Sequence, residues 1–231
     1  YRSYIPLIVL IIGTALYIHK ELYPETFILN DTPWEIYYEM FALFISLLGL
    51  GIRIYTVVHT PKNTSGRNTK EGQIADTLNT TGIYSVVRHP LYLGNFLMWF
   101  GPAMLIGNFW FLIVFCLFYW IYYERIMFAE EQFLRRKFGE NYLKWAEKVN
   151  AFIPNFKNFE KPNMPFSWKK VLKKEKNGLF ALFLIFSAYD VLGEVIHQEN
   201  DYNYFLIGMC ILSGLRYVVV KYLKMKTNVL N

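Results

Sequence analysis

Arg88, His89 and Pro90 stand where an apolar run of the chain begins, within the stretch GIYSVVRHPLYLGNF. Proline disfavours a helical conformation in the residue before it and fits the first position of a helix, so a helix should begin at Pro90 with His89 extended just outside. We expect the backbone N–H groups of Leu91 and Tyr92 to be free there. The positive end of a helix dipole lies at the same place, and carboxylates and phosphates bind to such ends.

Three side-chain positions add to this predicted anion site. Arg88 offers a forked donor, His89 a hydrogen-bonding ring, and Gly94 a position without a side chain where a ligand could approach the backbone. The alternative is an Arg–His pair that extends to lipid headgroups, with Gly94 as a notch for helix packing. The spacing of these residues alone does not separate the two interpretations.

A second cluster lies in YYERIMFAEEQFL, where Glu124 and Arg125 are followed within two helical turns by Glu130 and Glu131. Four ionisable residues at a membrane boundary predict a polar pocket, although such side chains can also simply reach the interface. Arg125 and Glu130 would be about 140° apart around a helix, so they should contact two ligands, or two parts of one. Arg53 lies inside another apolar run and is a third candidate, because an arginine there is costly unless it faces a partner or an aqueous cavity.

The elements that carry these residues are predicted to be membrane-spanning helices. The 231-residue chain is 54 % hydrophobic and 19 % aromatic. Its apolar runs are near the ~20 residues that cross hydrocarbon, and they cover about residues 4–19, 36–58, 91–107, 109–128, 178–197 and 203–223. A buried core helix is the alternative for any one run. The first run could also be a signal peptide, but it lacks a small-residue cleavage site, so we treat it as a span. We predict an all-α fold, a polytopic membrane helix bundle of about six transmembrane helices, with the third and fourth joined by a Gly107–Asn108 turn.

The charges set the expected orientation. Residues 129–177 carry 12 of the 24 Lys and Arg residues, so this segment and residues 59–88 should be cytoplasmic, with both termini inside. The net charge of +6 then reflects topology first and attraction to anionic headgroups second. No nucleic-acid-binding module is recognisable. Cys116 and Cys210 are too few and too isolated for a disulfide framework or a metal site.

The polar segments divide the chain. Residues 59–82 are predicted to be a long cytoplasmic loop, either functional or merely solvated. After the fourth span we expect a cytoplasmic amphipathic helix, broken near Gly139, that lies against the membrane or caps the bundle. A proline-punctuated linker follows. Residues 1–177 would form the core with the candidate site, and residues 178–231 a C-terminal transmembrane hairpin of the same membrane domain.

The two polar clusters together resemble the paired signature of integral membrane methyltransferases, the isoprenylcysteine carboxyl methyltransferase and phospholipid methyltransferase superfamily. In that signature a G-x-Y-x-x-x-R-H-P-x-Y-x-G segment is followed by an arginine, then by E-E-x-x-L and F-G-x-x-Y. The resemblance covers about residues 45–155. The matching positions are Gly82, Tyr84, Arg88, His89, Pro90, Tyr92, Gly94, Arg125, Glu130, Glu131, Leu134, Phe138, Gly139 and Tyr142.

The resemblance implies S-adenosylmethionine as methyl donor, bound on the cytoplasmic side between the helix that starts at Pro90 and the Glu130–Glu131 segment. The cofactor-binding residues would be Gly82, Tyr84, His89, Pro90, Leu91, Tyr92, Gly94, Glu130 and Glu131. The catalytic residues would be Arg53, Arg88 and Arg125, with Arg125 facing the acceptor and Arg53 in a comparable place in an earlier span, and no metal is expected. The physical reasoning agrees, because a helix start suits the cofactor carboxylate, a glutamate its amino group, and aromatic faces its sulfonium.

The number of arginines bears on the methyl acceptor. A carboxylate or phosphate is already a nucleophile and needs cationic orientation, whereas an amine must first lose a proton. Arg53, Arg67, Arg88 and Arg125 outnumber candidate bases near the proposed site, which favours an oxyanion. With its long 59–82 loop and its C-terminal hairpin, the chain looks most like a bacterial branch of this superfamily that methylates the phosphate of lipid A. The main prediction is therefore O-methylation of a lipid phosphate at the bacterial inner membrane.

Four other functions stay open at this point. An enzyme of the same class could methylate the carboxyl group of an isoprenylcysteine-like, lipid-anchored substrate or the amine of a phospholipid. A non-catalytic lipid-binding membrane protein could keep a basic pocket without needing the paired motifs. A membrane reductase of related architecture is the least favoured, because no dinucleotide fingerprint follows a strand-like segment. The sequence does not indicate an oligomeric state.

Overall fold

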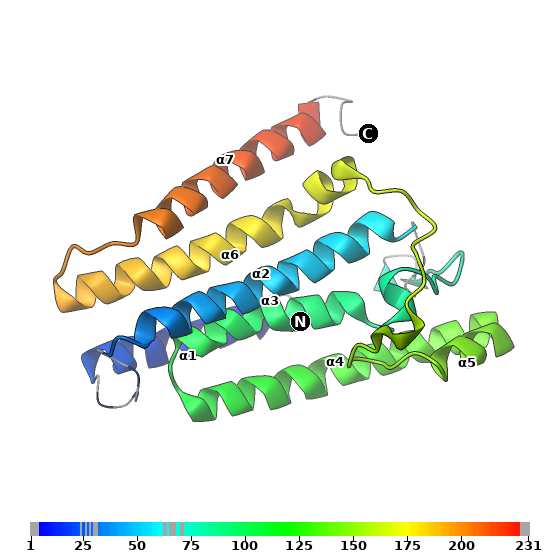
Figure 1. The fold of residues 1–231 in the computed structure, drawn as a ribbon, viewed down its shortest axis with the longest axis horizontal. Coiled ribbons are helices and arrows are strands. Elements are labelled where there is room, and N and C mark those ends of the chain that lie inside the picture. Colours follow the sequence, from blue (N-terminus) through cyan, green and yellow to red (C-terminus); the bar gives the residue numbers. More distant parts are fainter. Residues whose placement is uncertain are drawn as a thin grey trace. The chain divides into compact units, whose positions relative to one another are not determined.

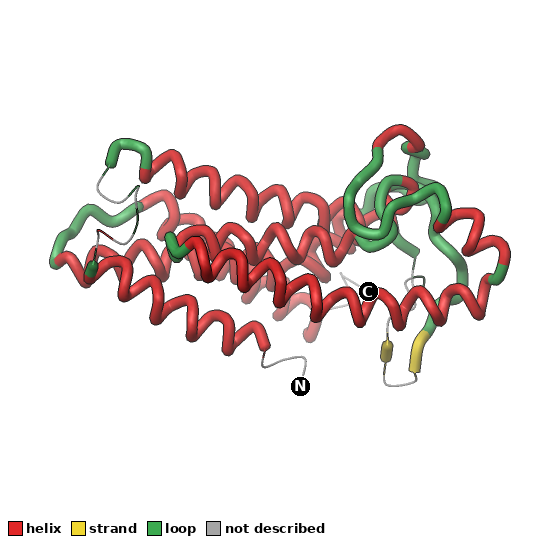
Figure 2. Tube along the Cα trace, turned by 90° about the horizontal axis from the view of Figure 1, so that it is seen from below, coloured by secondary structure: helices red, strands yellow, loops and turns green. Residues whose placement is uncertain are grey.

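The computed structural model describes residues 5–23, 25, 27, 29, 32–61, 64, 68–69 and 72–226. These residues form the α-helices drawn in Figure 1, with bounds α1 (Ile5–Leu22), α2 (Glu35–His59), α3 (Pro90–Leu105), α4 (Phe109–Phe138), α5 (Glu140–Ala146), α6 (Trp168–His197) and α7 (Tyr204–Lys226). Short 3-10 turns cover η2 (Ile83–Ser85) and η3 (Phe156–Asn158). The strands in the described part are β1 (Asn68–Thr69) and β2 (Gly72–Gln73), an antiparallel pair visible in Figure 2. The predicted helical class is therefore confirmed.

Four helices in the described part are long and apolar enough to cross a membrane: α2, α4, α6 and α7. The other two predicted spans fall on helices as well, α1 and α3, but these have 18 and 16 residues. At 1.5 Å per residue, α3 is about 24 Å long, short of the ~30 Å hydrocarbon core. Four spans are thus supported, and six stays a prediction.

The chain divides into two compact units, which are described one at a time. Unit 1 contains Tyr1–Leu50, Leu97–Leu117 and Glu175–Asn231, and unit 2 contains Gly51–Phe96 and Phe118–Lys174. The boundary that the sequence predicted after residue 177 lies within α6, which runs without a break from Trp168 to His197. The candidate site residues all belong to unit 2.

In unit 1, α2 and α3 approach closely because α3 has a glycine at the crossing. A Cβ atom on Gly101 would lie 2.1 Å from Ser46 Oγ and 2.3 Å from the Ala42 carbonyl oxygen. The turn after α3 depends on Gly107, whose φ of 66° is unfavourable for other residues. The predicted Gly107–Asn108 turn is therefore confirmed.

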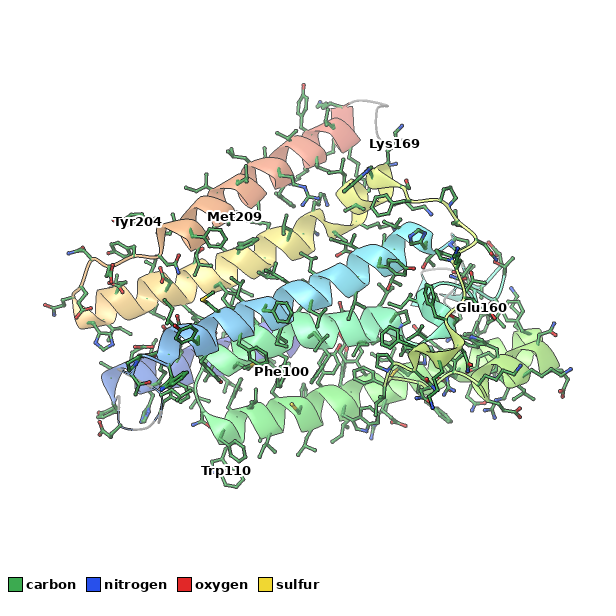
Figure 3. The ribbon with its side chains drawn as sticks, viewed as in Figure 1. Phe100, Trp110, Glu160, Lys169, Tyr204 and Met209 are labelled. Atoms are coloured by element: carbon green, nitrogen blue, oxygen red, sulfur yellow. The ribbon has the colours of Figure 1, made fainter. Side chains whose placement is uncertain are left out.

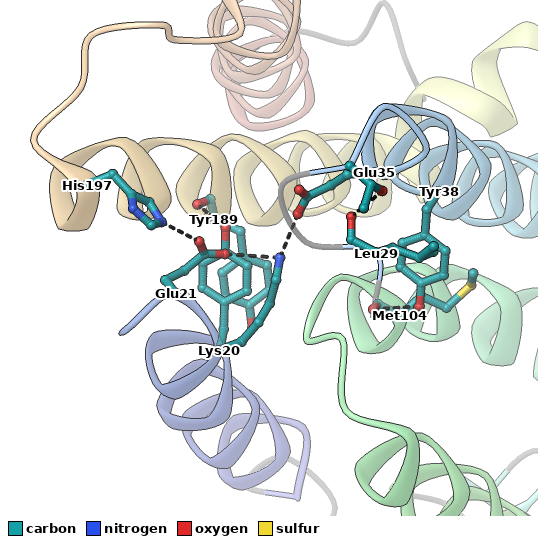
Figure 4. A network of polar contacts seen from close by, with 10 residues as sticks. Lys20, Glu21, Leu29, Glu35, Tyr38, Met104, Tyr189 and His197 are labelled. Atoms are coloured by element: carbon teal, nitrogen blue, oxygen red, sulfur yellow. Dashed lines mark hydrogen bonds and ion pairs between the residues drawn. The ribbon is translucent and has the colours of Figure 1, made fainter. Parts of the chain in front are cut away.

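A buried lysine ties three helices of unit 1 together (Figure 4). Lys20 Nζ on α1 lies 3.1 Å from Glu21 Oε1 and 3.1 Å from Glu35 Oε1 on α2. Glu21 Oε2 is 2.9 Å from His197 Nε2 at the end of α6. Buried charges persist only when paired in this way.

The α6–α7 connection of unit 1 is capped by two carboxylates. Asp190 Oδ2 accepts from the Asn203 backbone N–H at 3.0 Å, and Glu194 Oε2 accepts from the Asp201 backbone N–H at 2.8 Å. These acidic residues satisfy backbone donors of the turn, which gives them a structural function.

Large apolar side chains remain exposed on the helices of unit 1. Figure 3 shows Trp110 at the start of α4 and Tyr204 at the start of α7 projecting away from the ribbon. Exposed aromatic residues at the ends of apolar helices are typical of membrane interfaces. The pattern therefore agrees with an integral membrane protein.

In unit 2, α4 continues through the region predicted to be a separate amphipathic helix. Residues 129–138 are the last turns of α4, and the chain breaks at Gly139, with φ 51°, before α5. The break near Gly139 is confirmed, whereas the helix before it is the end of α4, so the amphipathic helix after the fourth span is not confirmed. Hydrogen bonding within α4 passes Glu130 and Glu131 without interruption, so both carboxylates are held on a rigid element.

Part of the predicted loop is packed against this α4–α5 corner. Ala75 is fully buried in a cluster with Leu134 and Tyr142, and Leu78 packs against the same cluster. The Gln73 side-chain amide also donates to the Ala129 carbonyl at 3.2 Å. Within the described residues 72–82, Ala75 and Leu78 thus belong to the unit's core, whereas Asp76 and Thr77 are exposed.

Candidate functional site

The start of α3 is as the proline pattern predicted. His89 is non-helical and Pro90 is the first helical residue. The Tyr92 N–H, which the sequence predicted to be free, donates to the His89 carbonyl at 3.1 Å, as does the Leu93 N–H. This correction follows from the first turn closing on the residue that precedes the proline. The Leu91 N–H has no acceptor among the described residues.

Arg88 is held by several protein acceptors. Its Nε donates to Glu131 Oε1 at 2.9 Å, and its Nη1 donates to the carbonyls of Ala146 at 2.7 Å and Val149 at 2.9 Å. Ala146 is the last residue of α5, where helices leave acceptors unsatisfied, and Val149 lies three residues after it. The guanidinium therefore joins α3, α4 and the end of α5, and this geometry favours a structural function over the predicted catalytic one.

The two adjacent glutamates on α4 have different partners. Glu131 Oε1 also lies 2.8 Å from His89 Nε2, whereas Glu130 Oε1 accepts from the Tyr92 hydroxyl at 2.7 Å. The His89 and Tyr92 rings stack with centroids 5.7 Å apart. Glu130 is only 6 % exposed. The structure therefore brings His89, Tyr92, Glu130 and Glu131 together, as the paired motif predicted.

The segment before α3 presents a buried tyrosine. Gly82 has φ 63°, and a Cβ there would lie 3.1 Å from Pro162 Cβ, so glycine is required both for the turn and for the close approach. Tyr84 follows in η2, and its carbonyl accepts from Trp145 Nε1 at 3.0 Å. Burial raises the pKa of Tyr84 to about 12, so its phenol stays protonated and uncharged at neutral pH.

A segment that runs from the end of the predicted amphipathic stretch into the predicted linker pairs with the predicted site. The Arg88 N–H donates to the Asn150 carbonyl at 2.9 Å, the His89 N–H to Ala151 at 3.1 Å, and the Asn155 N–H to Val86 at 3.0 Å. We call residues 150–160 the strap. Its far end also bonds, because the Gly82 N–H donates to the Glu160 carbonyl at 3.0 Å. Sequence reasoning missed this contact, since the proline punctuation indicated only an irregular connection.

The remaining predicted residues are less tightly connected. Arg53 on α2 donates through Nη1 to Asn95 Oδ1 on α3, a partner that the sequence did not suggest. Gly94 is buried and Leu91 half-buried on α3. Arg125 is exposed and makes no contact with a described residue of the network above. Arg67, which was counted among the arginines near the proposed site, lies outside the described residues.

The donor set is one of carboxylate, imidazole, phenol and backbone N–H groups. Among the described residues, no group of three or more His, Cys, Asp or Glu side chains is arranged to hold a metal ion. The buried Glu130 carboxylate can accept from an ammonium group, and the Leu91 N–H at the helix start can donate to a carboxylate. These groups are suited to a zwitterionic ligand.

Comparisons with known proteins fall on the same part of the chain. Residues 39–141 match the family described as phospholipid methyltransferase. The protein-S-isoprenylcysteine O-methyltransferase of Schizosaccharomyces pombe is 33 % identical over 117 residues, 51 % of this chain and 50 % of that protein. The enzyme of the same name from Xenopus laevis is 31 % identical over 133 residues, 58 % of this chain and 46 % of that protein. A probable one from Oryza sativa subsp. indica is 37 % identical over 78 residues, 33 % and 40 % of the two chains.

The chain spans about half the length of the curated relatives it matches. No solved structure matches it. The matched region holds Arg53, the Pro90 helix start and both glutamates of α4, but it ends before the strap.

Proposed function

We propose, from the premise that residues 39–141 match the phospholipid methyltransferase family, that this chain transfers a methyl group from S-adenosylmethionine to an acceptor held in the membrane. The observation that supports this most directly is the Tyr92–Glu130 hydrogen bond beside the His89–Glu131 contact. These two contacts join the motif segment at the start of α3 to the motif segment on α4, which are about 40 residues apart in the sequence. A lipid-binding protein without catalysis would not need both segments in register.

The residues present fit the chemical groups of this cofactor. The buried Glu130 carboxylate would accept from the amino group, and the Leu91 N–H at the start of α3 would donate to the carboxylate. The faces of Tyr84 and Tyr92 offer the π-surface that attracts a sulfonium cation. When bound, S-adenosylmethionine supplies an electrophilic methyl group.

The chain's own contribution is to position these groups. Glu131 accepts from Arg88 and lies against His89, which orients the first residues of α3 on the rigid α4 helix. Tyr119 donates its hydroxyl to the Tyr92 carbonyl at 2.8 Å and so supports the turn that carries the Tyr92 phenol. Because methyl transfer is an in-line displacement, fixed orientation of the donor is the main requirement.

For the acceptor we propose a carboxylate on a lipid-anchored substrate. The relatives reported above are named for O-methylation of protein isoprenylcysteine. An isoprenylcysteine-like substrate was the alternative in the sequence interpretation, and it agrees better with these relatives than the lipid A phosphate of the main prediction. A bacterial lipid A branch finds no support among the relatives. Both acceptors are oxyanions, and Arg53 and Arg125 would orient either one through charge-assisted hydrogen bonds.

The proposed site would face the cytoplasm, where the cofactor is soluble. The positive charge of residues 129–177 supports this orientation, with six spans and both termini on the same side. Placement in a bacterial inner membrane stays a prediction.

The test uses the full chain in lipid nanodiscs. Calorimetry with S-adenosylmethionine should show binding to the wild type and about 10-fold or more weaker binding to Glu130→Gln. Transfer of a labelled methyl group should then occur to a farnesylcysteine derivative and not to total lipid extract. Labelled phosphoglycolipid would restore the lipid phosphate prediction, and absence of cofactor binding by the wild type would overturn the proposed function.

A further inference from the structure

The strap has an apolar side that no described part of the chain covers. Ile153 and Phe156 are each 74 % exposed, and Phe159 is 49 % exposed. Three large apolar side chains exposed within seven residues are unusual for a segment that faces water. Two exposed lysines, Lys157 and Lys161, each lie within two residues of Phe159 in the sequence.

The depth of the strap is indicated by one of its own residues, the half-buried Phe152. The Phe152 ring lies edge-on to Phe96 with centroids 6.0 Å apart, and edge-on to Trp120 at 5.8 Å. Trp120 is in the middle of the apolar run of α4, a candidate membrane span. Phe96 is six residues, or about 9 Å, along α3 from Pro90. Phe152 therefore lies beside the apolar parts of two helices, past the point where α3 begins.

Trp120 helps to identify what surrounds the strap. It is 50 % exposed on α4, a helix long and apolar enough to cross a membrane, so its exposed face would meet lipid. Phe152 packs against this residue, and Ile153 is next to it in the chain. Lys157 and Lys161 can extend their amines from such a position to lipid phosphates.

We propose that the strap is a membrane-inserted element, in which Ile153 and Phe156 enter the lipid of one leaflet, and that this insertion holds the start of α3 in place. The second part follows from the backbone contacts. The opposite edge of the strap accepts from the Arg88 and His89 N–H groups and donates to the Val86 carbonyl. Lipid on one side of the strap and residues 86–89 on the other are thus linked through a few residues of backbone.

This coupling does not depend on the proposed reaction. It states that residues 86–89, whatever they bind, keep their conformation only while the strap is inserted. A protein removed from a bilayer would lose part of this support, because apolar side chains such as Phe156 would then face water at a cost of about 1.5–3 kcal/mol of transfer free energy each.

The first test measures depth in the full chain. Both native cysteines are first removed by Cys116→Ala and Cys210→Ala. A single cysteine then replaces Ile153 or Phe156 and carries a nitroxide label. Asn158, in the same 3-10 turn as Phe156, is replaced and labelled in the same way as the matched control. In phosphatidylcholine–phosphatidylglycerol nanodiscs, labels at 153 and 156 should be accessible to oxygen and protected from a water-soluble nickel chelate, with the reverse at 158. Equal accessibility of all three positions to the nickel chelate would overturn insertion.

The second test measures the coupling by hydrogen exchange of a peptide covering residues 86–93. The Ile153→Ser, Phe156→Ser double variant should exchange at least 10-fold faster than the wild type in the same nanodiscs, while Asn158→Ala should not differ. Peptides from α7 serve as an internal control for global unfolding. Unchanged protection of residues 86–93 in the double variant would overturn the coupling, whatever the methyl-transfer assays show.

Discussion

Tyr92 donates its phenolic hydroxyl to Glu130 Oε1 at 2.7 Å, although the two residues are 38 positions apart and on different helices. The bond fixes one oxygen of a buried carboxylate on α4 relative to the first turn of α3. Because the acceptor is an ionisable group, this hydrogen bond is stronger than one between neutral groups.

Tyr92→Phe should therefore weaken S-adenosylmethionine binding by about 10- to 100-fold, the effect of removing a hydrogen bond to a charged group. The ring and its stacking on His89 remain in this variant, so the loss comes from the hydroxyl alone. Calorimetry in nanodiscs measures it, with Tyr37→Phe, an exposed tyrosine on α2, as the control. Equal affinities for Tyr92→Phe and wild type would show that Glu130 does not need this orientation.

The neighbouring glutamates offer a matched pair of isosteric variants. Glu131→Gln removes the charge that faces Arg88 and His89 and places an amide donor near the guanidinium, so the protein should lose about 2 kcal/mol of stability. Glu130→Gln should lower cofactor affinity more and stability less. Thermal unfolding and calorimetry on both variants decide this. If the two variants shift both quantities alike, the division of functions between Glu130 and Glu131 is wrong.

The sequence was sufficient for the parts of the site that depend on local rules. The helix start at Pro90 follows from proline geometry, and the break at Gly139 from the absence of a side chain. The joining of the His89 and Glu131 segments followed from their paired motif. The helical class followed from the length of the apolar runs, although only four of the described helices are long and apolar enough to count as spans.

Other parts could not be predicted because they depend on tertiary contacts between irregular segments. The strap binds Arg88 and His89 through backbone groups, and backbone groups leave no signature in side-chain sequence. Arg88 was predicted to be catalytic as one of several arginines near the proposed site that could orient an oxyanion acceptor. Only the structure shows the Ala146 and Val149 carbonyls that occupy it.

Gly101 provides a test of helix packing in unit 1. An alanine there would place its Cβ within 2.3 Å of the Ala42 backbone oxygen, so α2 and α3 would have to separate. We expect Gly101→Ala to destabilise the protein by about 1–3 kcal/mol. Gly51→Ala on α2 is the control, since a Cβ at Gly51 would meet no described atom within 4 Å, and it should be neutral or stabilising by about 0.5–1 kcal/mol. Unfolding in mixed micelles, followed by tryptophan fluorescence, measures both; a Gly101→Ala protein as stable as Gly51→Ala would contradict the close approach.

Arg125 separates acceptor binding from cofactor binding. It lies on α4 five residues before Glu130 and is exposed, whereas Arg88 is held by protein acceptors. Its guanidinium is therefore available to an oxyanion acceptor, and Arg125→Ala should leave the dissociation constant for S-adenosylmethionine within about twofold while lowering kcat/KM by about 10-fold or more.

Two further variants make this prediction specific. Arg125→Lys should recover part of the activity, because it keeps the charge but not the planar fork. Arg136→Ala, an exposed arginine near the end of the same helix, should not change kcat/KM. If Arg125→Ala instead abolishes cofactor binding, Arg125 belongs to the donor half of the site and the acceptor must be oriented by Arg53 and its Asn95 partner.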